Sequence, residues 1–409
     1  MICVWLSVLG NIGLLAYFKY FNFFIDNANH ILGSLNIAHI PLLEISLPLG
    51  ISFYTFQTLS YQIDLYRGKV KAQRSLRDFS LFVSLFPQLI AGPIVRYKEI
   101  ERQLSDRKES IDQFFYGCGR FICGLGKKVL IADGLAPLVD SIFVNSPSDL
   151  SVQVVWLGLA AFLLQIYYDF SGYSDMAIGI GRMFGFRLPE NFRYPYSARS
   201  ITAFWQRWHM TLTAWLRDYV FTSIVSKKRS SLSTDFAIFF VFLLCGFWHG
   251  ANWTFIVFGA YFGLILIIER HYWQRYGRYM SPALQHLYVV FILLLSVAFF
   301  RSPNLTYALE LLARAFSFQN NPQSLILVEV LNNERVIILI SGTLFSMPLV
   351  PFILKMLEKI DTHSQRSVYQ APLKVARQLV PCFACLLVFL LSVIASSAAT
   401  YNPFIYFQF

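Results

Sequence analysis

The residue best suited to chemistry is His249, which lies inside the uncharged run Phe236–Ile268. A titratable side chain deep in a long apolar segment is a functional candidate by default. Loss of hydration disfavours the imidazolium form, so the ring is expected to stay neutral and able to accept a proton. A neutral imidazole beside a hydroxyl group is a good general base. The sequence therefore predicts proton transfer at His249; the alternative is a core histidine bonded to a backbone carbonyl.

Small and polar residues close to this histidine in the chain are candidates to complete such a site. Gly246 and Gly250 are expected to leave room for a substrate, and Trp248 and Trp253 supply N–H donors. Asn252 is the candidate for stabilising a developing oxyanion, an assignment that rests on its residue type alone.

A second histidine, His209, ends the segment WQRWH (205–209). Three roles stay open for it: binding a donor substrate, orienting His249, or acting as a second acid or base. The alternative is a histidine at the level of the lipid headgroups. Arg207, in the same segment, needs water or a partner.

Two carboxylates, Asp169 and Asp175, directly follow an apolar run in the segment YYDFSGYSD (167–175). Buried carboxylates need partners, and Arg182, Arg193 or a histidine is expected to provide one. A structural or positioning role is favoured over catalysis for both aspartates.

The motifs of several other protein classes are missing from the sequence. It has no Walker loop, dinucleotide fingerprint, G-x-S-x-G elbow or HExxH site. Cys382 and Cys385 have metal-ligand spacing, but no second pair or nearby histidine completes a zinc site. No metal and no bound cofactor is therefore expected. The net charge of +11 comes from basic stretches between apolar runs, so nucleic acid is not an expected partner.

The elements that position these residues are predicted to be membrane helices. Hydrophobic residues make up 56% of the chain and charged residues only 14%, too few charges to cover a soluble domain. A helix of about 20 apolar residues spans the hydrocarbon layer. The sequence thus predicts an all-α, polytopic integral membrane protein of about nine to eleven helices, with membrane lipids around it. The candidate spans are 1–18, 45–63, 79–95, 150–168, 236–268, 283–300, 336–354 and 379–398.

Three of these segments carry specific expectations. Phe236–Ile268 is too long for one crossing and has basic flanks, Lys227–Arg229 and Arg270–Arg278, so it is expected to enter, turn near His249–Asn252 and return. This places the histidine roughly 20 Å from the charged entrance. The aromatic spacing of Phe204–Tyr219 predicts a helix lying along the membrane interface. Met1–Phe18 is interpreted as a retained anchor, because Lys19 follows the apolar run instead of preceding it.

Several long segments in fixed order resemble the membrane-bound O-acyltransferase (MBOAT) family, and within it the bacterial branch that acetylates exopolysaccharides such as alginate. The resemblance covers most of the chain from about Asn11 to Tyr272. The segments that carry it are LPLGISFYTFQTLSYQIDLYRG (47–68), FPQLIAGPIVRYKEI (86–100), YYDFSGYSDMAIGIGRMFGFRLPENFRYPY (167–196), FWQRWHMTLTAWLRDYVF (204–221) and CGFWHGANWTFIVFGAYFG (245–263).

This resemblance implies many helices around a central tunnel, with re-entrant and interfacial segments. His249 matches the family's catalytic histidine and His209 its second histidine. The implied donor is cytoplasmic, with acetyl-CoA as the expected substrate. The implied acceptors are an extracytoplasmic partner acetyltransferase or a polysaccharide. The implied location is the bacterial inner membrane.

The resemblance also bears on domain organisation. Residues 1–409 are expected to form a single domain with a motif-bearing core at about 45–270. Relatives usually carry further N-terminal helices before the block Asn11–Phe24, so this chain is expected to lack them.

Other functions remain as alternatives to acetylation of a polysaccharide such as alginate. The chain could serve as the acyl-transfer subunit for peptidoglycan or teichoic acid. A transporter is a second class, although no paired halves with matching broken helices are found. A non-catalytic scaffold that recruits an extracytoplasmic enzyme is the third.

Overall fold

The computed structural model describes residues 2–225, 230–317, 324–353, 355–356 and 370–398. These residues form helices joined by turns and loops, and no strand is assigned among them; Leu150 and Leu325 make an isolated bridge. The predicted all-α class is confirmed. The basic flank Lys227–Arg229 lies outside the described residues.

Six helices of the described chain are long and apolar enough to cross a membrane. Their bounds are Val4–Ser34, Val152–Met183, Ser231–His249, Trp253–Trp273, Pro282–Arg301 and Leu379–Ser397. Three predicted spans correspond to shorter helices. Span 45–63 overlaps α3 (Ile51–Tyr66), and span 79–95 overlaps α4 (Leu76–Ser84) and contains α5 (Phe86–Leu89). Span 336–354 overlaps α19 (Asn333–Phe345).

The remaining helices complete the chain order. They are α1 (Ile2–Leu15), α2 (Phe21–Ser34), α6 (Tyr97–Ser105), α7 (Ile111–Gly126), α8 (Asp133–Phe143), α9 (Val152–Met183), α10 (Ile201–Trp205), α11 (Met210–Trp215), α12 (Thr222–Ile224), α13 (Ser231–His249), α14 (Trp253–Ile268), α15 (Gln274–Tyr276), α16 (Pro282–Arg301), α17 (Leu305–Ala315), α18 (Leu327–Val330) and α21 (Gln370–Ala398). Four π-helical turns interrupt or extend them: η1 (Ala16–Tyr20), η2 (Lys127–Ala132), η5 (Leu216–Phe221) and η6 (Glu269–Trp273).

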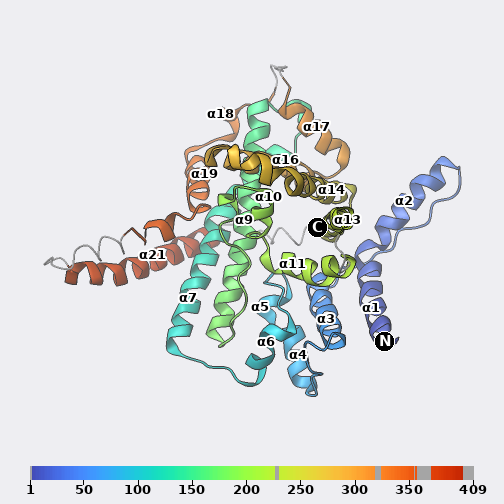
Figure 1. Ribbon diagram of the computed structural model, residues 1–409. Coiled ribbons are helices and arrows are strands. Elements are labelled where there is room, and N and C mark those ends of the chain that lie inside the picture. The colour runs from blue at the N-terminus through green and yellow to red at the C-terminus, as the bar shows by residue number, and fades with distance from the viewer. Residues whose placement is uncertain (1, 226–229, 318–323, 354, 357–369, 399–409) are drawn as a thin grey trace.

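Helix α9 runs through the middle of the molecule with α7 beside it (Figure 1). Two glycine pairs let these helices approach closely. A Cβ atom on Gly117 would lie 2.6 Å from the carbonyl oxygen of Gly179, and one on Gly124 would lie 2.6 Å from that of Gly172. Only glycine fits at such contacts, which is the small-residue packing typical of membrane helices.

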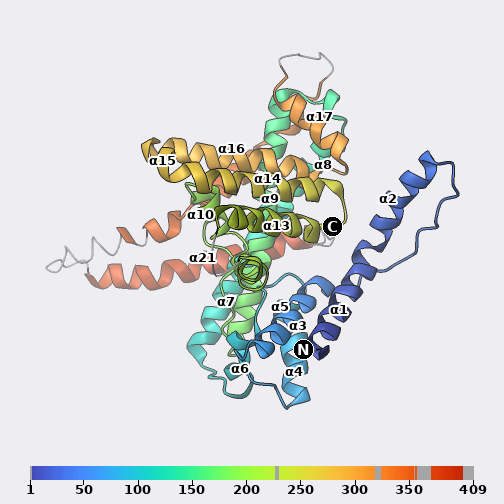
Figure 2. The ribbon, with the colours of Figure 1, turned by 45° about the vertical axis from the view of Figure 1, so that its right-hand side comes forward.

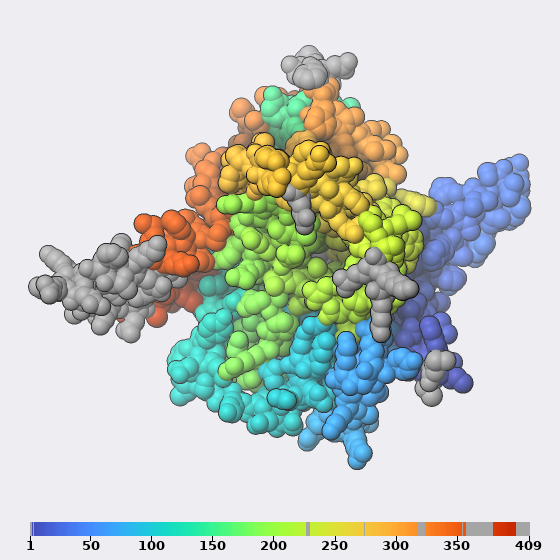
Figure 3. Space-filling view, in the orientation of Figure 1, coloured from blue at the N-terminus to red at the C-terminus, as the bar shows by residue number. Residues whose placement is uncertain are grey.

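Helices α13, α14 and α16 lie side by side and cross α9 (Figure 2). The chain leaves α13 at His249 and starts α14 at Trp253, so the predicted turn inside the run 236–268 is confirmed. The largest hydrophobic cluster of the described residues lies between α8, α9, α10, α14, α16 and α17. By contrast, α2 and α21 project from opposite sides of this body (Figure 1), and α2 stands out at the edge of the molecule in Figure 3.

The segment 204–219 does not form the single helix that its aromatic spacing predicts. The chain forms α10, a turn, α11 and η5, and His209 stands in the turn with left-handed backbone angles. Trp208 and Trp215 are buried in the protein, at 7% and 5% exposure. The helical spacing of aromatic residues therefore reflects packing against neighbouring helices, which requires the same residue types as a membrane interface.

The N-terminal anchor also differs from its prediction. Lys19 does not end the apolar helix; it lies within η1, and the helix continues through α2 to Ser34. The lysine is therefore inside a candidate membrane span and needs partners there.

Candidate active site

His249 is the last residue of α13, and its ring lies beside two separate cavities. Its side chain is buried, with 6% exposure. The ring of Phe300 packs edge-on at 5.3 Å between centroids, and that of Phe258 at 6.1 Å. The thiol of Cys245, one helical turn earlier, lies 3.9 Å from Nε2 of the histidine. The imidazole thus has apolar neighbours, and His249 is among the residues that line both cavities.

The larger cavity has a volume of about 250 Å³. It lies between η1, the segment 47–53 at the start of α3, Ile90 and the end of α13. Apolar groups form most of its wall, and Lys19, Ser52, Trp248 and His249 supply the polar groups.

The smaller cavity has a volume of about 40 Å³ and an almost wholly apolar lining. Its lining residues come from α9, from α10 and the turn that follows it, from α14 and from α16; Trp205, Phe262 and Leu293 are among them. Because His249 lines both cavities, a group bound on one side of its ring is close to a group bound on the other.

The end of α13 is held by residues of η1. Nζ of Lys19 donates hydrogen bonds to the carbonyl oxygens of Trp248 at 2.7 Å and His249 at 3.1 Å. The hydroxyl of Tyr20 donates to the carbonyl oxygen of Phe247 at 3.2 Å. The last carbonyls of a helix have no partner within it, so these bonds stabilise the turn that carries the histidine.

Trp248 lies between the two histidines. Its ring centroid is 4.9 Å from that of His249 and 6.3 Å from that of His209. Its Nε1–H group is buried and has no hydrogen-bond partner among the described residues. A buried donor without a partner costs free energy, so this group is available to a ligand in the adjoining cavity.

His209 is 1% exposed and is fixed by Asn191. Nδ1 of His209 lies 3.0 Å from Oδ1 of Asn191, which also accepts hydrogen bonds from the backbone N–H and the hydroxyl of Thr211. A backbone N–H can only donate, so this atom of Asn191 is the oxygen and Nδ1 of His209 carries the hydrogen. Nε2 is then the acceptor, and it has no partner among the described residues.

Burial also controls the charge of His209. Loss of hydration, and in second place the nearby His249, hold the pKa of His209 well below its usual value. The ring is therefore neutral near pH 7, with a basic lone pair on Nε2. Sequence reasoning missed Asn191, although it found the histidine that it orients.

Comparisons with known proteins show the family to which this chain belongs. A family model described as MBOAT, membrane-bound O-acyltransferase family, matches residues 69–309. The probable alginate O-acetylase AlgI of Azotobacter vinelandii is 39% identical over 426 residues, which cover 99% of this chain and 84% of that protein. The chain belongs to the membrane-bound O-acyltransferase family.

Further relatives of this acyltransferase carry the names of related activities. The probable alginate O-acetylase AlgI of Pseudomonas aeruginosa is 44% identical over 314 residues, covering 76% of this chain and 60% of that protein. The peptidoglycan O-acetyltransferase of Helicobacter pylori is 37% identical over 337 residues, covering 75% and 63%. The chain is accordingly a multi-pass membrane acyltransferase, and the region matched by the family includes both histidines.

Two residues near His249 have other structural roles than those the sequence predicts. Asn252 is the N-cap of α14: its Oδ1 accepts from the N–H of Thr254 at 3.1 Å, and its Nδ2 donates to the carbonyl of Pro303 at 2.9 Å. It is not among the residues that line either cavity. Trp253 is exposed and donates to Oδ1 of Asn27 on α2.

The two glycines that flank the histidine do not leave room for a substrate. A Cβ atom on Gly246 would lie 2.2 Å from the carbonyl oxygen of Phe255, and one on Gly250 would lie 2.3 Å from the ring of the same residue. The space beside these glycines is filled by α14. Their absence of a side chain serves close helix packing, so that expectation is wrong.

The carboxylates of α9 pair with residues that the sequence did not indicate. Asp169 forms an ion pair with Lys128 at 2.6 Å, and Asp175 with Arg120 at 2.6 Å and Lys127 at 2.7 Å. The expected partners Arg182, Arg193 and histidine are not the ones found in these ion pairs. The pairs join α9 to α7 and η2. Arg207 donates to the hydroxyl of Ser197 at 2.7 Å and also stands apart from both cavities.

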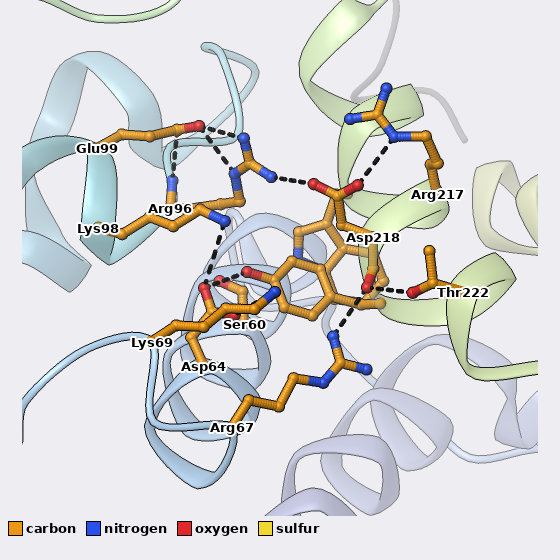
Figure 4. A network of polar contacts seen from close by, with 12 residues as sticks. Ser60, Asp64, Arg67, Lys69, Arg96, Lys98, Glu99, Arg217, Asp218 and Thr222 are labelled. Atoms are coloured by element: carbon orange, nitrogen blue, oxygen red, sulfur yellow. Dashed lines mark hydrogen bonds and ion pairs between the residues drawn. The ribbon is translucent and has the colours of Figure 1, made fainter. Parts of the chain in front are cut away.

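A network of charged side chains joins α3 and α6 to η5, the segment that follows α11 (Figure 4). Asp64 accepts a hydrogen bond from the hydroxyl of Tyr219 at 2.5 Å and forms ion pairs with Lys69 and Lys98, both at 3.8 Å. The carboxylate of Asp218 accepts from Arg96 at 2.6 Å.

The electrostatics of this network favour its charged form. Burial acts to raise the pKa of Asp218, but the guanidinium groups of Arg217 and Arg96 outweigh it and lower that pKa. The indole of Trp215 adds a hydrogen bond to the carbonyl of Phe56 at 3.0 Å. Together these contacts fix α3, whose first turn lines the larger cavity, against the segment that begins at His209.

Proposed function

We propose that this acyltransferase moves an acetyl group from a cytoplasmic donor, with acetyl-CoA as the donor, to a hydroxyl acceptor on the opposite side of a bacterial inner membrane. The observation that carries the proposal is the position of His249 between two cavities, at the turn that joins two candidate membrane spans. A base at this place can reach a donor on one side and an acceptor on the other.

The direction of transfer follows from the charges at the ends of the helices. Excess Lys and Arg mark cytoplasmic segments, and the stretch Arg270–Arg278 follows α14 directly. Phe258 and Phe262 of the smaller cavity lie on α14 between the histidine turn and this basic stretch. The smaller cavity therefore belongs to the donor side, and the larger cavity to the acceptor side.

The residues of the site support general base catalysis. The hydroxyl oxygen of the acceptor attacks the carbonyl carbon of the thioester, while the imidazole of His249 takes the hydroxyl proton. The carbonyl oxygen carries the negative charge of the tetrahedral intermediate. When the C–S bond breaks, the thiolate leaves and takes the proton from the imidazolium. His209, with its lone pair on Nε2, acts as a second base along the same path.

For the acceptor, we infer an extracytoplasmic polysaccharide, with alginate as the first candidate. The support is that two relatives matching almost the whole chain, at 39% and 38% identity, are named as probable alginate O-acetylases. A peptidoglycan or teichoic acid acceptor is the alternative, because relatives with those activities match at 37% and 31% identity. An extracytoplasmic acetyltransferase is the proposed protein partner that receives or uses the acetyl group.

The decisive experiment replaces His249 in the full chain. Cells that lack the native protein are complemented with wild type, His249→Gln or His286→Gln at matched membrane levels, and the O-acetyl content of the glycan is measured. His286 is a suitable control because it lies on α16 outside both cavities. We expect a loss of at least about 100-fold for His249→Gln, as for removal of a general base, and full rescue by His286→Gln.

Equal rescue by the two variants would contradict the catalytic role of His249. The chain would then act through another residue or as a scaffold for an extracytoplasmic enzyme.

A further inference from the structure

Lys19 is a partly buried cation that the mechanism above does not use. It lies inside the candidate membrane span Val4–Ser34, where a charged side chain is costly and marks a functional place. The π-helical turn η1 contains it, and such turns inside α-helices occur frequently at functional sites. The residue also precedes the region matched by the family, which starts at residue 69.

Two of the three N–H groups of Lys19 have known partners. They donate to the carbonyl oxygens of Trp248 and His249, the last two residues of α13. The ammonium group also lies 5.8 Å from the ring centroid of Trp248. A cation at the C-terminal end of a helix is further stabilised by the helix dipole. The lysine is therefore rigidly placed beside the catalytic histidine.

The third N–H group can donate to a molecule in the larger cavity, because Lys19 lines that cavity together with His249. Of the described residues around that cavity, it is the one that carries a Lys or Arg charge. The indole N–H of Trp248, which lines the same cavity, is buried without a partner among the described residues. Two donors therefore adjoin the cavity where the acceptor binds.

We propose that Lys19 is a further catalytic residue, which donates its third N–H group to the carbonyl oxygen of the acyl group as that oxygen becomes negatively charged. This proposal rests on the acyl transfer proposed above. Attack by the acceptor hydroxyl opens the C=O double bond and leaves an oxyanion. A charged donor aimed at this oxygen stabilises the oxyanion more strongly than it stabilises the neutral carbonyl. The two remaining N–H groups keep the end of α13, and with it the imidazole, in place.

The test compares three variants in vesicles that contain the full chain and the polysaccharide acceptor, with radiolabelled acetyl-CoA as the donor. Lys19→Met removes the charge and all three donors. Lys19→Arg keeps a charged donor. Tyr20→Phe is the matched control, because it removes a neighbouring hydrogen bond from η1 to the same end of α13, at Phe247, without removing a charge.

We expect Lys19→Met to lower kcat by about 100-fold or more, as for loss of an oxyanion donor, with little change in KM. Lys19→Arg should recover at least tenfold of that loss, and Tyr20→Phe, which loses only the bond to Phe247, should lower kcat at least tenfold less than Lys19→Met does. The thermal unfolding temperature and the membrane level of each variant are measured alongside.

Three results would overturn the proposal. The first is a kcat for Lys19→Met within threefold of wild type. The second is an equal loss in Tyr20→Phe, which would assign the effect to the position of α13 alone. The third is an effect on KM without one on kcat. If Lys19→Met does not accumulate in the membrane, Lys19→Gln takes its place; it keeps N–H donors without the charge, and wild-type kcat in that variant would equally overturn the role.

The same vesicles separate this proposal from the proposed function. An inactive His249→Gln variant together with an active Lys19→Met variant would remove only the role of the lysine. Full activity of His249→Gln would remove the proposed mechanism itself.

Discussion

At the scale of single residues, the amide of Asn191 decides which nitrogen of His209 carries its hydrogen. The same amide donates from Nδ2 to the hydroxyl of Ser174 on α9 at 3.1 Å. It therefore joins the loop before α10, the turn at His209 and the central helix. The left-handed backbone of His209, with φ at 44°, is a costly conformation for a residue with a side chain, and these bonds help to hold it.

A substitution of Asn191 should therefore change activity through His209. Asn191→Leu leaves the Nδ1–H of His209 and both donors of Thr211 without their acceptor. We expect a loss of about tenfold or more in acetyl transfer, because a wrongly oriented base loses part of its 10²–10⁴-fold contribution. Asn191→Asp keeps the acceptor oxygen and should retain more activity. Equal activity of Asn191→Leu and wild type in the vesicle assay would contradict the orienting role.

Single residues also show where sequence reading reaches its limit. His249 could be found because a titratable residue stands out in a long apolar run. Asn191 could not, since its partner is 18 positions away and the contact exists only once the loop has folded. Asn252 carried a usable signal that was interpreted differently: an Asn directly before an apolar helix is a typical N-cap, and that is its role in α14.

At the scale of elements, the contact between α7 and α9 depends on glycine positions that face each other. Gly124 lies against the backbone of Gly172, whereas a Cβ on Gly119, on the same helix, would meet nothing within 4 Å. In the sequence, the four glycines of α7 look alike as sites of close helix contact: Gly117, Gly119, Gly124 and Gly126. Which of them face a neighbour depends on how α7 is rotated against α9, and composition does not contain that information.

The two glycines of α7 give opposite predictions for the same substitution. Gly124→Ala should destabilise the protein by about 1–3 kcal/mol, because the new methyl group meets a backbone carbonyl that cannot move away easily. Gly119→Ala should be neutral or stabilising by up to about 1 kcal/mol, because alanine is the better helix former. Thermal unfolding of the purified variants in detergent measures both. A similar change in the two variants would show that the helices are not in close contact at Gly124.

The turn inside the run 236–268 could be predicted from the length of the run and the charges that flank it. The run 236–268 had to turn because it exceeds one membrane thickness, and the hairpin of α13 and α14 follows. The prediction of a single helix over 204–219 is wrong. A helical spacing of Trp, Tyr and Phe suits a protein core as well as a lipid interface. The predicted end of the N-terminal span at Phe18 differs from the structure for a related reason. Lys19 resembles the charged flank of a span, but its ammonium group is hydrogen-bonded to backbone carbonyls inside the protein.

At the scale of the whole molecule, two cavities of very different size meet at one imidazole. The larger measures about 250 Å³, and the smaller only about 40 Å³. Its wall of large side chains from α9, α14 and α16 limits the length of the acyl chain. The size of the transferred group is thus a property of helices that are distant in the sequence.

Widening that cavity should broaden the choice of acyl donor. Leu293→Ala removes three carbon atoms from its wall, whereas Leu287→Ala changes an exposed residue of the same helix that is not among the residues lining either cavity. We expect the ratio of kcat/KM for butyryl-CoA over acetyl-CoA to rise about tenfold or more in Leu293→Ala, because each methylene accommodated is worth about 1–3 kcal/mol. Leu287→Ala should leave the ratio unchanged. An unchanged ratio in both variants would show that another part of the path limits chain length.

The π-helical turn η1 has a consequence for the evolution of this helix. It lies between α1, which is joined to α3 by a hydrogen bond between Asn11 and Thr58, and the side chains of Lys19 and Tyr20 that hold α13. A π-turn corresponds to one inserted residue, and each residue rotates a helix by about 100°. Deleting Phe18 would restore a regular helix. Either Asn11 would then turn away from α3, or Lys19 and Tyr20 would turn away from α13. Lineages of this protein should therefore exchange residues within η1 far more readily than they lose one.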